Sequence, residues 1–179
     1  MPDTYIPSDL VRADVRFSFG DAEVEKALLR QEAALALEKM FQAAENENII
    51  LFAVSGYRSY KRQEEVFNAE VVKSGEEYAK SVVAIPGQSE HQTGLTMDIS
   101  AESVQFDLTE SFEHTAEGQW LAEHAHEYGF ILRYPKGKED ITGYSFEPWH
   151  FRYVGINFAK TIYEKQLTLE EYFEIVKEI

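Results

Sequence analysis

The stretch of residues 89–99 constrains the fold more than any other part of this chain. It places His91 and Asp98 seven positions apart, with Gly94 between them and an apolar end typical of a buried strand. A turn at Gly94 would fold both side chains back toward one point, and their nitrogen and oxygen atoms are ligand types that suit zinc. A third ligand must then come from elsewhere, so the fold has to bring distant segments together.

The length of the chain indicates one domain with a substantial core. Its 179 residues are too few for two comfortable domains, and 44% of them are hydrophobic and 13% aromatic, with no low-complexity tract. Residues 1–19 carry two prolines and scattered charges without a sustained period, so we expect an extended N-terminal arm there. Residues 20–179 form the predicted domain.

Charge and cysteine content exclude several classes of function. The formal net charge is −15, which argues against nucleic acid or an anionic membrane surface as the main partner, because phosphate binding needs a basic face. The chain has no cysteine, so a metal must be held by His, Asp or Glu. No apolar run approaches the roughly 20 residues of a membrane span, and the N-terminus lacks the regions of a signal peptide.

The pattern of apolar residues predicts an α+β domain, in which helices flank a small, mainly antiparallel sheet. Strands are expected beside the end of the 89–99 stretch, over residues 49–54, 130–134 and 147–154. Helices are expected over residues 21–46 (with Asp21 as N-cap), 60–73 (with Ser59 as N-cap), 76–83, 115–126, 156–165 and 169–177. Residues 101–113 and 135–144 are expected to be loops.

A second histidine with a nearby carboxylate occurs at Glu147 and His150. An ideal strand would send these two side chains to opposite faces, but Pro148 cannot donate to a ladder and favours a bend that lets them converge. A set of His91, Asp98 and His150 leaves one tetrahedral position for water, and a glutamate that is not a ligand can take the proton of that water.

Three ordered blocks of sequence resemble the VanY-like zinc D-alanyl-D-alanine carboxypeptidases, which trim bacterial peptidoglycan stem peptides. Within that family the chain is most similar to the L,D-carboxypeptidases LdcB and DacB. The similarity extends from about Tyr5 onward, and three blocks in order are far more specific than any one of them. The blocks are Ser55-Gly56-Tyr57-Arg58-Ser59 with Gln63; Gly87-Gln88-Ser89-Glu90-His91-Gln92-Thr93-Gly94-Leu95 to Asp98; and Glu147-Pro148-Trp149-His150-Phe151-Arg152-Tyr153-Val154-Gly155.

The resemblance implies a role for each matching residue. It makes zinc the cofactor and identifies its ligands as His91, Asp98 and His150. It also makes Glu147 the general base and Arg58 the group that stabilises the oxyanion. The family often has alanine where this chain has Thr96, a position to which no role is attached.

Substrate binding is expected at Gln63, Ser89 and Trp149. Each has a plainer interpretation: Gln63 as an exposed helix residue, Ser89 as a turn residue and Trp149 as a packing aromatic. Arg58 taken alone is better explained as a helix cap or as the partner of a surface acid, and its place in the first block favours a role in the active site. The other histidines, at positions 114, 124 and 126, are expected to be solvated.

The function that the resemblance implies is zinc-dependent removal of the terminal D-alanine from stem peptides. We expect L,D-carboxypeptidase activity on tetrapeptides, with D,D-carboxypeptidase activity on pentapeptides as the alternative and endopeptidase activity as a weaker one. From a different class, the chain could be a non-catalytic binding module with a structural zinc. A structural site needs neither a base nor an oxyanion partner, so Glu147 and Arg58 favour an enzyme.

The expected partners are muropeptides, with no nucleic acid and no nucleotide cofactor, and the protein is expected to be a monomer. Because its substrate would lie outside the membrane, we expect an exported protein at the cell surface or in the cell wall, whose signal or anchor is absent from this chain. A recycling enzyme in the cytoplasm is the alternative.

Overall fold

Four short strands form the antiparallel sheet at the centre of the protein. In the computed structural model, which describes residues 1–177, their order across the sheet is β3 (Phe52–Ser55), β4 (Thr96–Ser100), β6 (His150–Tyr153) and β5 (Phe130–Leu132). Each neighbouring pair is antiparallel. This confirms the predicted α+β class and the antiparallel sheet.

The two faces of this sheet differ in chemistry. Successive side chains on a strand point to opposite faces, so Met97 and Ile99 lie on the face opposite Asp98. Met97, Ile99 and Phe151 belong to the hydrophobic core and are almost completely buried. Asp98 and His150 lie on the other face, where they are also buried. One face therefore stabilises the fold, and the other carries polar groups.

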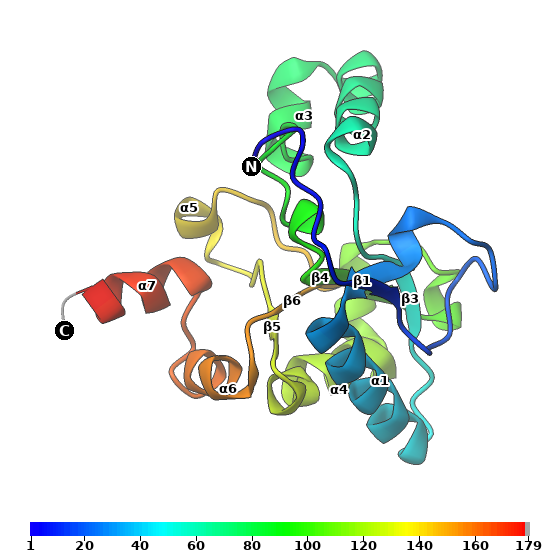
Figure 1. Cartoon of the computed structure of the whole chain (residues 1–179). Helices are drawn as coiled ribbons and strands as arrows, with labels where there is room; N and C mark the ends of the chain where they lie inside the picture. Colours follow the sequence, from blue (N-terminus) through cyan, green and yellow to red (C-terminus); the bar gives the residue numbers. More distant parts are fainter. Residues whose placement is uncertain (178–179) are drawn as a thin grey trace.

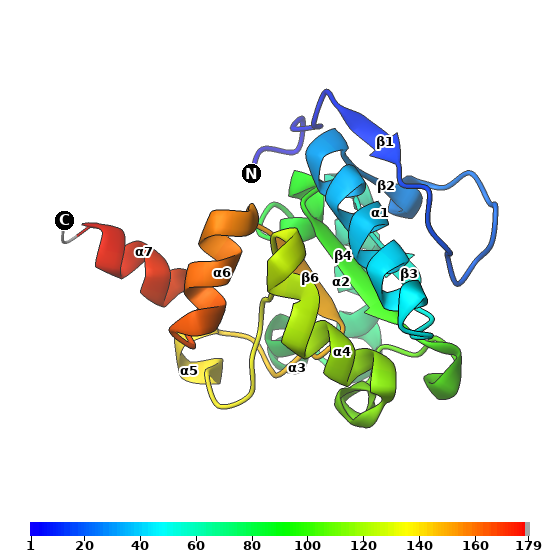
Figure 2. The same cartoon turned by 90° about the horizontal axis from the view of Figure 1, so that it is seen from below.

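Two helices cover the apolar face. Helix α1 (Gln31–Asn46) contributes the fully buried Leu37 and Met40, and helix α4 (Ala116–His124) contributes Leu121. Both helices lie on the same side of the sheet, as Figures 1 and 2 show.

A second, smaller cluster forms beside β5. Helices α6 (Ile156–Glu164) and α7 (Leu169–Lys177) pack there through Ile162 and Leu169. Figure 2 shows α7 extending from the body of the protein beyond α6. The bounds predicted for α7 are confirmed.

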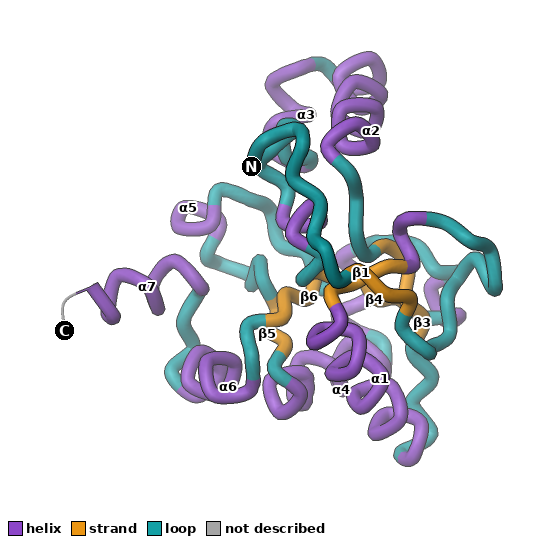
Figure 3. Tube along the Cα trace, viewed as in Figure 1, coloured by secondary structure: helices purple, strands orange, loops and turns teal. Residues whose placement is uncertain are grey.

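A helical hairpin stands on the opposite side of the sheet (Figure 3). It consists of α2 (Tyr60–Ser74) and α3 (Glu76–Val82). The two helices are separated by Gly75, whose φ of +86° suits glycine. The predicted N-cap of α2 is confirmed, because Ser59 Oγ accepts a hydrogen bond from the Arg62 amide at 3.3 Å.

The N-terminal segment departs from the prediction. The helix expected from Asp21 begins only at Gln31, after η1 (Glu25–Ala27) and β2 (Leu28–Arg30). Strand β2 pairs with β1 (Leu10–Arg12), and the Arg30 amide donates to the Gly94 carbonyl at 2.8 Å. Pairing with the N-terminal arm thus overrides the helical spacing that includes Leu29. A strand of only three residues is too short to show a strand pattern in the sequence.

Several connections that were expected to be loops contain short helical turns. These are η3 (Glu102–Val104), η4 (Glu110–His114) and α5 (Glu139–Thr142). The helix predicted over residues 115–126 ends at His124 and continues as η5 (Ala125–Tyr128). Histidine 114 is exposed as expected, whereas the ring of His126 stacks on that of Tyr163 with centroids 3.7 Å apart. None of the described helices has both the length and the apolar character that crossing a bilayer requires.

Candidate metal centre and active site

Strand register places three polar side chains in a row across the sheet. Ser55 of β3 lies opposite Asp98 of β4, and Asp98 lies opposite His150 of β6. Residues directly opposite on antiparallel strands project to the same face, so these side chains are neighbours although they come from distant parts of the chain. The row, called here the polar ladder, is the base of the site.

His91 reaches the polar ladder from a short helical turn, η2 (Glu90–Thr93). Ser89 caps this turn by accepting a hydrogen bond from the His91 amide at 3.3 Å. Gly94 ends it in the left-handed conformation with φ +67°. The turn predicted at Gly94 is therefore confirmed, and it returns the chain into β4.

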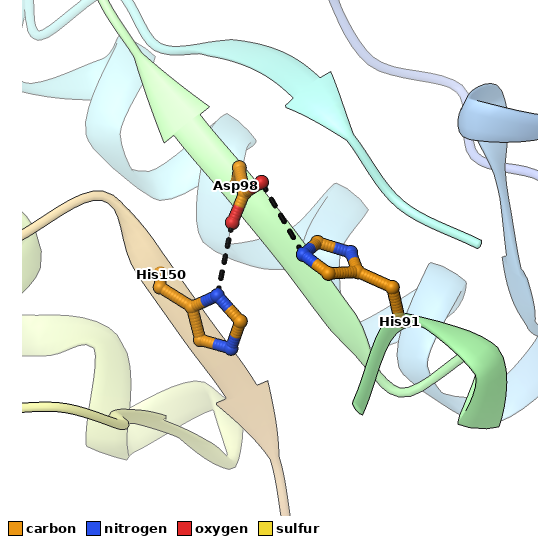
Figure 4. A group of neighbouring side chains, drawn as sticks. All are labelled: His91, Asp98 and His150. Carbon is orange, nitrogen blue, oxygen red and sulfur yellow. Dashed lines mark ion pairs between the residues drawn. The ribbon is translucent and has the colours of Figure 1, made fainter. Parts of the chain in front are cut away.

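Asp98 lies between the two imidazole rings (Figure 4). Its Oδ2 is 3.3 Å from His91 Nε2, and its Oδ1 is 3.1 Å from His150 Nδ1. One potential ligand atom from each of the three residues lies within 4.8 Å of the others. All three side chains are at least 94% buried. The structure therefore brings together the three residues that were predicted as metal ligands.

The hydrogen bonding of His91 favours a cation between these groups. Its Nδ1 lies 2.7 Å from the Gly56 carbonyl, which can only accept, so Nδ1 carries the hydrogen. Burial lowers the pKa of His91, which keeps the ring neutral at pH 7. The lone pair of Nε2 then faces the Asp98 carboxylate, and two acceptors facing each other at this distance are favourable only around a positive charge.

The surroundings of His150 also attract positive charge. Burial lowers the pKa of His150, but the carboxylates of Asp98 and Glu90 outweigh burial and raise it to about 9. Burial opposes ionisation of Asp98, but the hydrogen bond from His150 holds the pKa of that carboxyl below its ordinary value. Two imidazoles and one carboxylate form a donor set suited to zinc, with a further coordination position open to water or substrate. The residues present fit a metal ion.

Glu147 lies beside this set. The His150 amide donates to the Glu147 carbonyl at 3.2 Å, which closes a bend at Pro148, as predicted. The Glu147 Oε2 consequently lies 3.4 Å from His150 Nδ1. Burial raises the pKa of Glu147 to about 7, partly offset by His150. A carboxylate with a pKa near neutrality is suited to accept and return a proton.

Arg58 is fixed by several contacts. Its amide donates to the His91 carbonyl at 3.2 Å, its Nη2 donates to Ser55 Oγ at 3.2 Å and its Nη1 donates to Gln63 Oε1 at 2.9 Å. Gln63 Nε2 donates in turn to the Ala84 carbonyl at 2.6 Å. Gln63 is only 1% exposed, so its amide orients Arg58 and ties α2 to the segment after α3.

A cleft of about 210 Å³ is lined by most of these groups. The eight predicted site residues line it: Arg58, Gln63, Ser89, His91, Asp98, Glu147, Trp149 and His150. Tyr134 and Tyr144 also line the cleft, and the ring of Tyr134 lies 4.8 Å from that of His150. Neither tyrosine was predicted, because nothing in a loop sequence shows which side chains turn back toward the sheet.

Three charged residues behind His150 were likewise missed. The carboxylate of Glu90 lies 2.8 Å from Arg133 Nε and 3.1 Å from Arg152 Nη1. Arg152 follows His150 by two positions on β6, so the strand period would have placed it on the same face. No comparable signal marks Arg133. Glu90 was noted only as the residue before His91.

Two imidazoles and a carboxylate with an open position, beside a second carboxylate and an arginine, are the arrangement of metal-dependent hydrolases. Similarity to known proteins makes this class more specific. Residues 26–156 match the family model described as VanY, D-alanyl-D-alanine carboxypeptidase, and the chain belongs to that family.

Individual relatives agree with this membership. The protein YodJ of Bacillus subtilis (strain 168) is 58% identical over 179 residues, which is 100% of this chain and 65% of YodJ. The chain thus spans less than two thirds of that relative. The structure of the LdcB LD-carboxypeptidase superposes with a TM-score of 0.92 at 58% identity, covering 97% of this chain and 80% of that one.

A third relative was solved with metal. The structure of a vancomycin resistance D,D-pentapeptidase VanY mutant in complex with Zn(II) superposes with a TM-score of 0.73 at 34% identity. It covers 94% of this chain and 93% of that one. The superposition covers nearly the whole of both chains, so the match is not confined to the site.

Proposed function

We propose that this protein is a zinc-dependent carboxypeptidase that removes the terminal D-alanine from peptidoglycan stem peptides, with L,D specificity for tetrapeptides. The observation that carries the proposal is the placement of Glu147 and Arg58 in one cleft with His91, Asp98 and His150. A purely structural metal site would need neither the base nor the arginine.

Zinc is the metal proposed for the three ligands. The presence of Zn(II) in the related VanY structure supports this choice, as does the mixed nitrogen and oxygen donor set. When bound, zinc would supply Lewis acidity to water and to the scissile carbonyl. His91, Asp98 and His150 would hold it.

The remaining chemistry falls to the residues of the chain. Glu147 Oε2 takes a proton from the water that attacks the scissile carbonyl carbon, a role that suits its pKa of about 7. The guanidinium of Arg58 stabilises the negative charge that develops on the carbonyl oxygen. As the C–N bond breaks, Glu147 returns the proton to the nitrogen of the departing D-alanine.

Substrate specificity is the finer part of the proposal. Removal of D-alanine from a tetrapeptide cuts an L–D bond, and removal from a pentapeptide cuts a D–D bond. The greater identity to the LdcB LD-carboxypeptidase, 58% against 34% for the D,D-pentapeptidase VanY, supports L,D specificity. Because stem peptides lie outside the membrane, we place the reaction there.

Incubation of zinc-loaded protein with purified tetrapeptide and pentapeptide muropeptides, followed by mass spectrometry, tests this proposal. Loss of one alanine from the tetrapeptide alone is expected. The matched control is Glu147→Gln, which keeps the shape of the side chain and should bind zinc without turnover. Loss from the pentapeptide alone would make the enzyme a D,D-carboxypeptidase, and no loss from either with zinc bound would favour a binding module.

A further inference from the structure

Glu90 precedes a predicted metal ligand in the sequence, but its side chain lies against a different one. Its Oε2 is 3.6 Å from His150 Nε2. Both atoms are buried, and neither has a hydrogen-bond partner among the described residues. Since Nε2 of an imidazole can donate and a carboxylate oxygen accepts, a small rotation of either side chain would satisfy both atoms at once.

The other oxygen of Glu90 is already engaged. Its Oε1 lies 2.8 Å from Arg133 Nε and 3.1 Å from Arg152 Nη1. The Glu90 side chain is only 14% exposed, and its Oε1 faces both of these cations. Glu90 is therefore an acceptor at both oxygens, with Oε2 left facing His150.

Arg133 is itself held in place from outside the site. Its Nη1 and Nη2 form a bidentate pair with Glu170 at the start of α7, at 3.0 and 2.5 Å. Paired guanidinium and carboxylate groups of this kind fix orientation as well as charge. The carboxylate of Glu90 thus has little freedom to move away from His150.

We propose that Glu90 is a positioning residue for the metal centre, which accepts the Nε2 hydrogen of His150 and thereby directs Nδ1 toward Asp98 and the metal. This inference rests on the proposed function, because it assumes that His91, Asp98 and His150 bind a metal. Carboxylates that accept the second ring hydrogen of a ligating histidine orient the ring and increase its basicity, and losing one typically weakens metal binding about 10- to 100-fold.

A merely structural role predicts something else. If Glu90 only neutralises the buried Arg133 and the partly buried Arg152, its loss lowers the stability of the fold while metal binding remains. Glu170 supplies the matched comparison, because it pairs with Arg133, whereas the ion pairs of His150 within the described residues are with Glu90, Asp98 and Glu147. Metal affinity separates the two roles.

The experiment compares Glu90→Ala, Glu90→Gln and Glu170→Ala with the wild type. Zinc affinity is measured by competition with a chromophoric chelator, the visible spectrum is recorded after loading with Co²⁺, and thermal melting monitors the fold. Glu90→Ala should remain folded, because Arg133 keeps Glu170 as a partner and Arg152 is 18% exposed.

Both Glu90 variants should bind zinc about 10- to 100-fold more weakly and alter the Co²⁺ spectrum. The glutamine variant tests geometry at constant volume: its oxygen would stay with the arginines, so its amide group would face His150 Nε2 and could not accept. Glu170→Ala should melt at a lower temperature but keep its zinc affinity within about twofold.

Unchanged zinc affinity and an unchanged Co²⁺ spectrum in both Glu90 variants would overturn the inference, as would an equal loss of affinity in Glu170→Ala. The positioning role and the proposed function can fail separately. If the wild type binds zinc and the Glu90 variants bind it more weakly, but the wild type releases no alanine, then the positioning role stands and the peptidase assignment is refuted.

Discussion

Removal of the metal should lower the thermal stability of the protein by a predictable amount. The three proposed ligands come from η2, β4 and β6, and only folding brings them together, so the unfolded chain has no comparable site. A ligand that binds only the folded state stabilises it by about 2.7 kcal/mol when its free concentration is 100 times Kd. For a chain of 179 residues, each kcal/mol corresponds to about 2–4 °C in Tm, which gives an increase of about 5–11 °C.

Differential scanning calorimetry of the zinc-loaded and the chelator-treated protein measures this difference directly. The matched variant is Asp98→Asn, which keeps the size of the central ligand and removes its charge. Its Tm should be nearly independent of zinc. The prediction concerns the increment caused by zinc in each protein, because the substitution also changes the stability of the metal-free form.

An identical Tm for the wild type with and without zinc, across concentrations up to 1,000 times Kd, would refute the reasoning. A full zinc-dependent increment in Asp98→Asn would do the same, since a buried site without this carboxylate should bind the cation far more weakly.

Three further outcomes are expected. Arg58→Lys keeps the positive charge but loses the guanidinium group that donates to two partners. In steady-state kinetics, kcat should therefore fall about 100- to 1,000-fold with a smaller change in KM. A wild-type kcat in this variant would contradict the prediction. Gly129→Ala should lower stability by about 1–3 kcal/mol in urea melts, because φ is +86° and the new Cβ would lie 2.8 Å from Tyr153 Cε2; a neutral effect would contradict the backbone argument. Burial and the Glu32 carboxylate raise the pKa of Tyr153 to about 12, whereas a tyrosine in an unfolded chain titrates at about pH 10. The protonated Tyr153 hydroxyl therefore contributes fully to the free energy of unfolding below about pH 10, and this contribution is lost as the pH rises toward 12. Urea melts at pH 9 and pH 11 should show a smaller loss in Tyr153→Phe than in the wild type, and equal losses would count against it.

Most of the secondary structure was predictable because its signals are local. Ser59 bonds to a backbone amide three residues away, and Gly94 supplies the one backbone conformation that its turn needs. The helices and the central strand follow from apolar spacing. The start of α1 was mispredicted because β2 depends on pairing with Leu10–Arg12, an interaction that spacing alone does not reveal.

The candidate site could be predicted as a set of residues but not as an arrangement. The motif residues around His91 and Glu147 were identified from their ligand chemistry and from the resemblance, and the structure places them in one cleft. The environment behind them was not predictable, because the pairing of Arg133 with Glu90 and Glu170 joins three segments through side chains alone. Such contacts leave no period in the sequence.

The polar ladder also makes the candidate metal centre depend on correct pairing of the strands. Ser55, Asp98 and His150 stand level with one another only when three strands from different parts of the chain have paired correctly. A slip of one residue would turn Asp98 toward the apolar face and remove the middle ligand. A newly made chain therefore lacks the complete set of proposed ligands until these strands have paired, so the metal content of a preparation should measure the fraction of molecules in the native register.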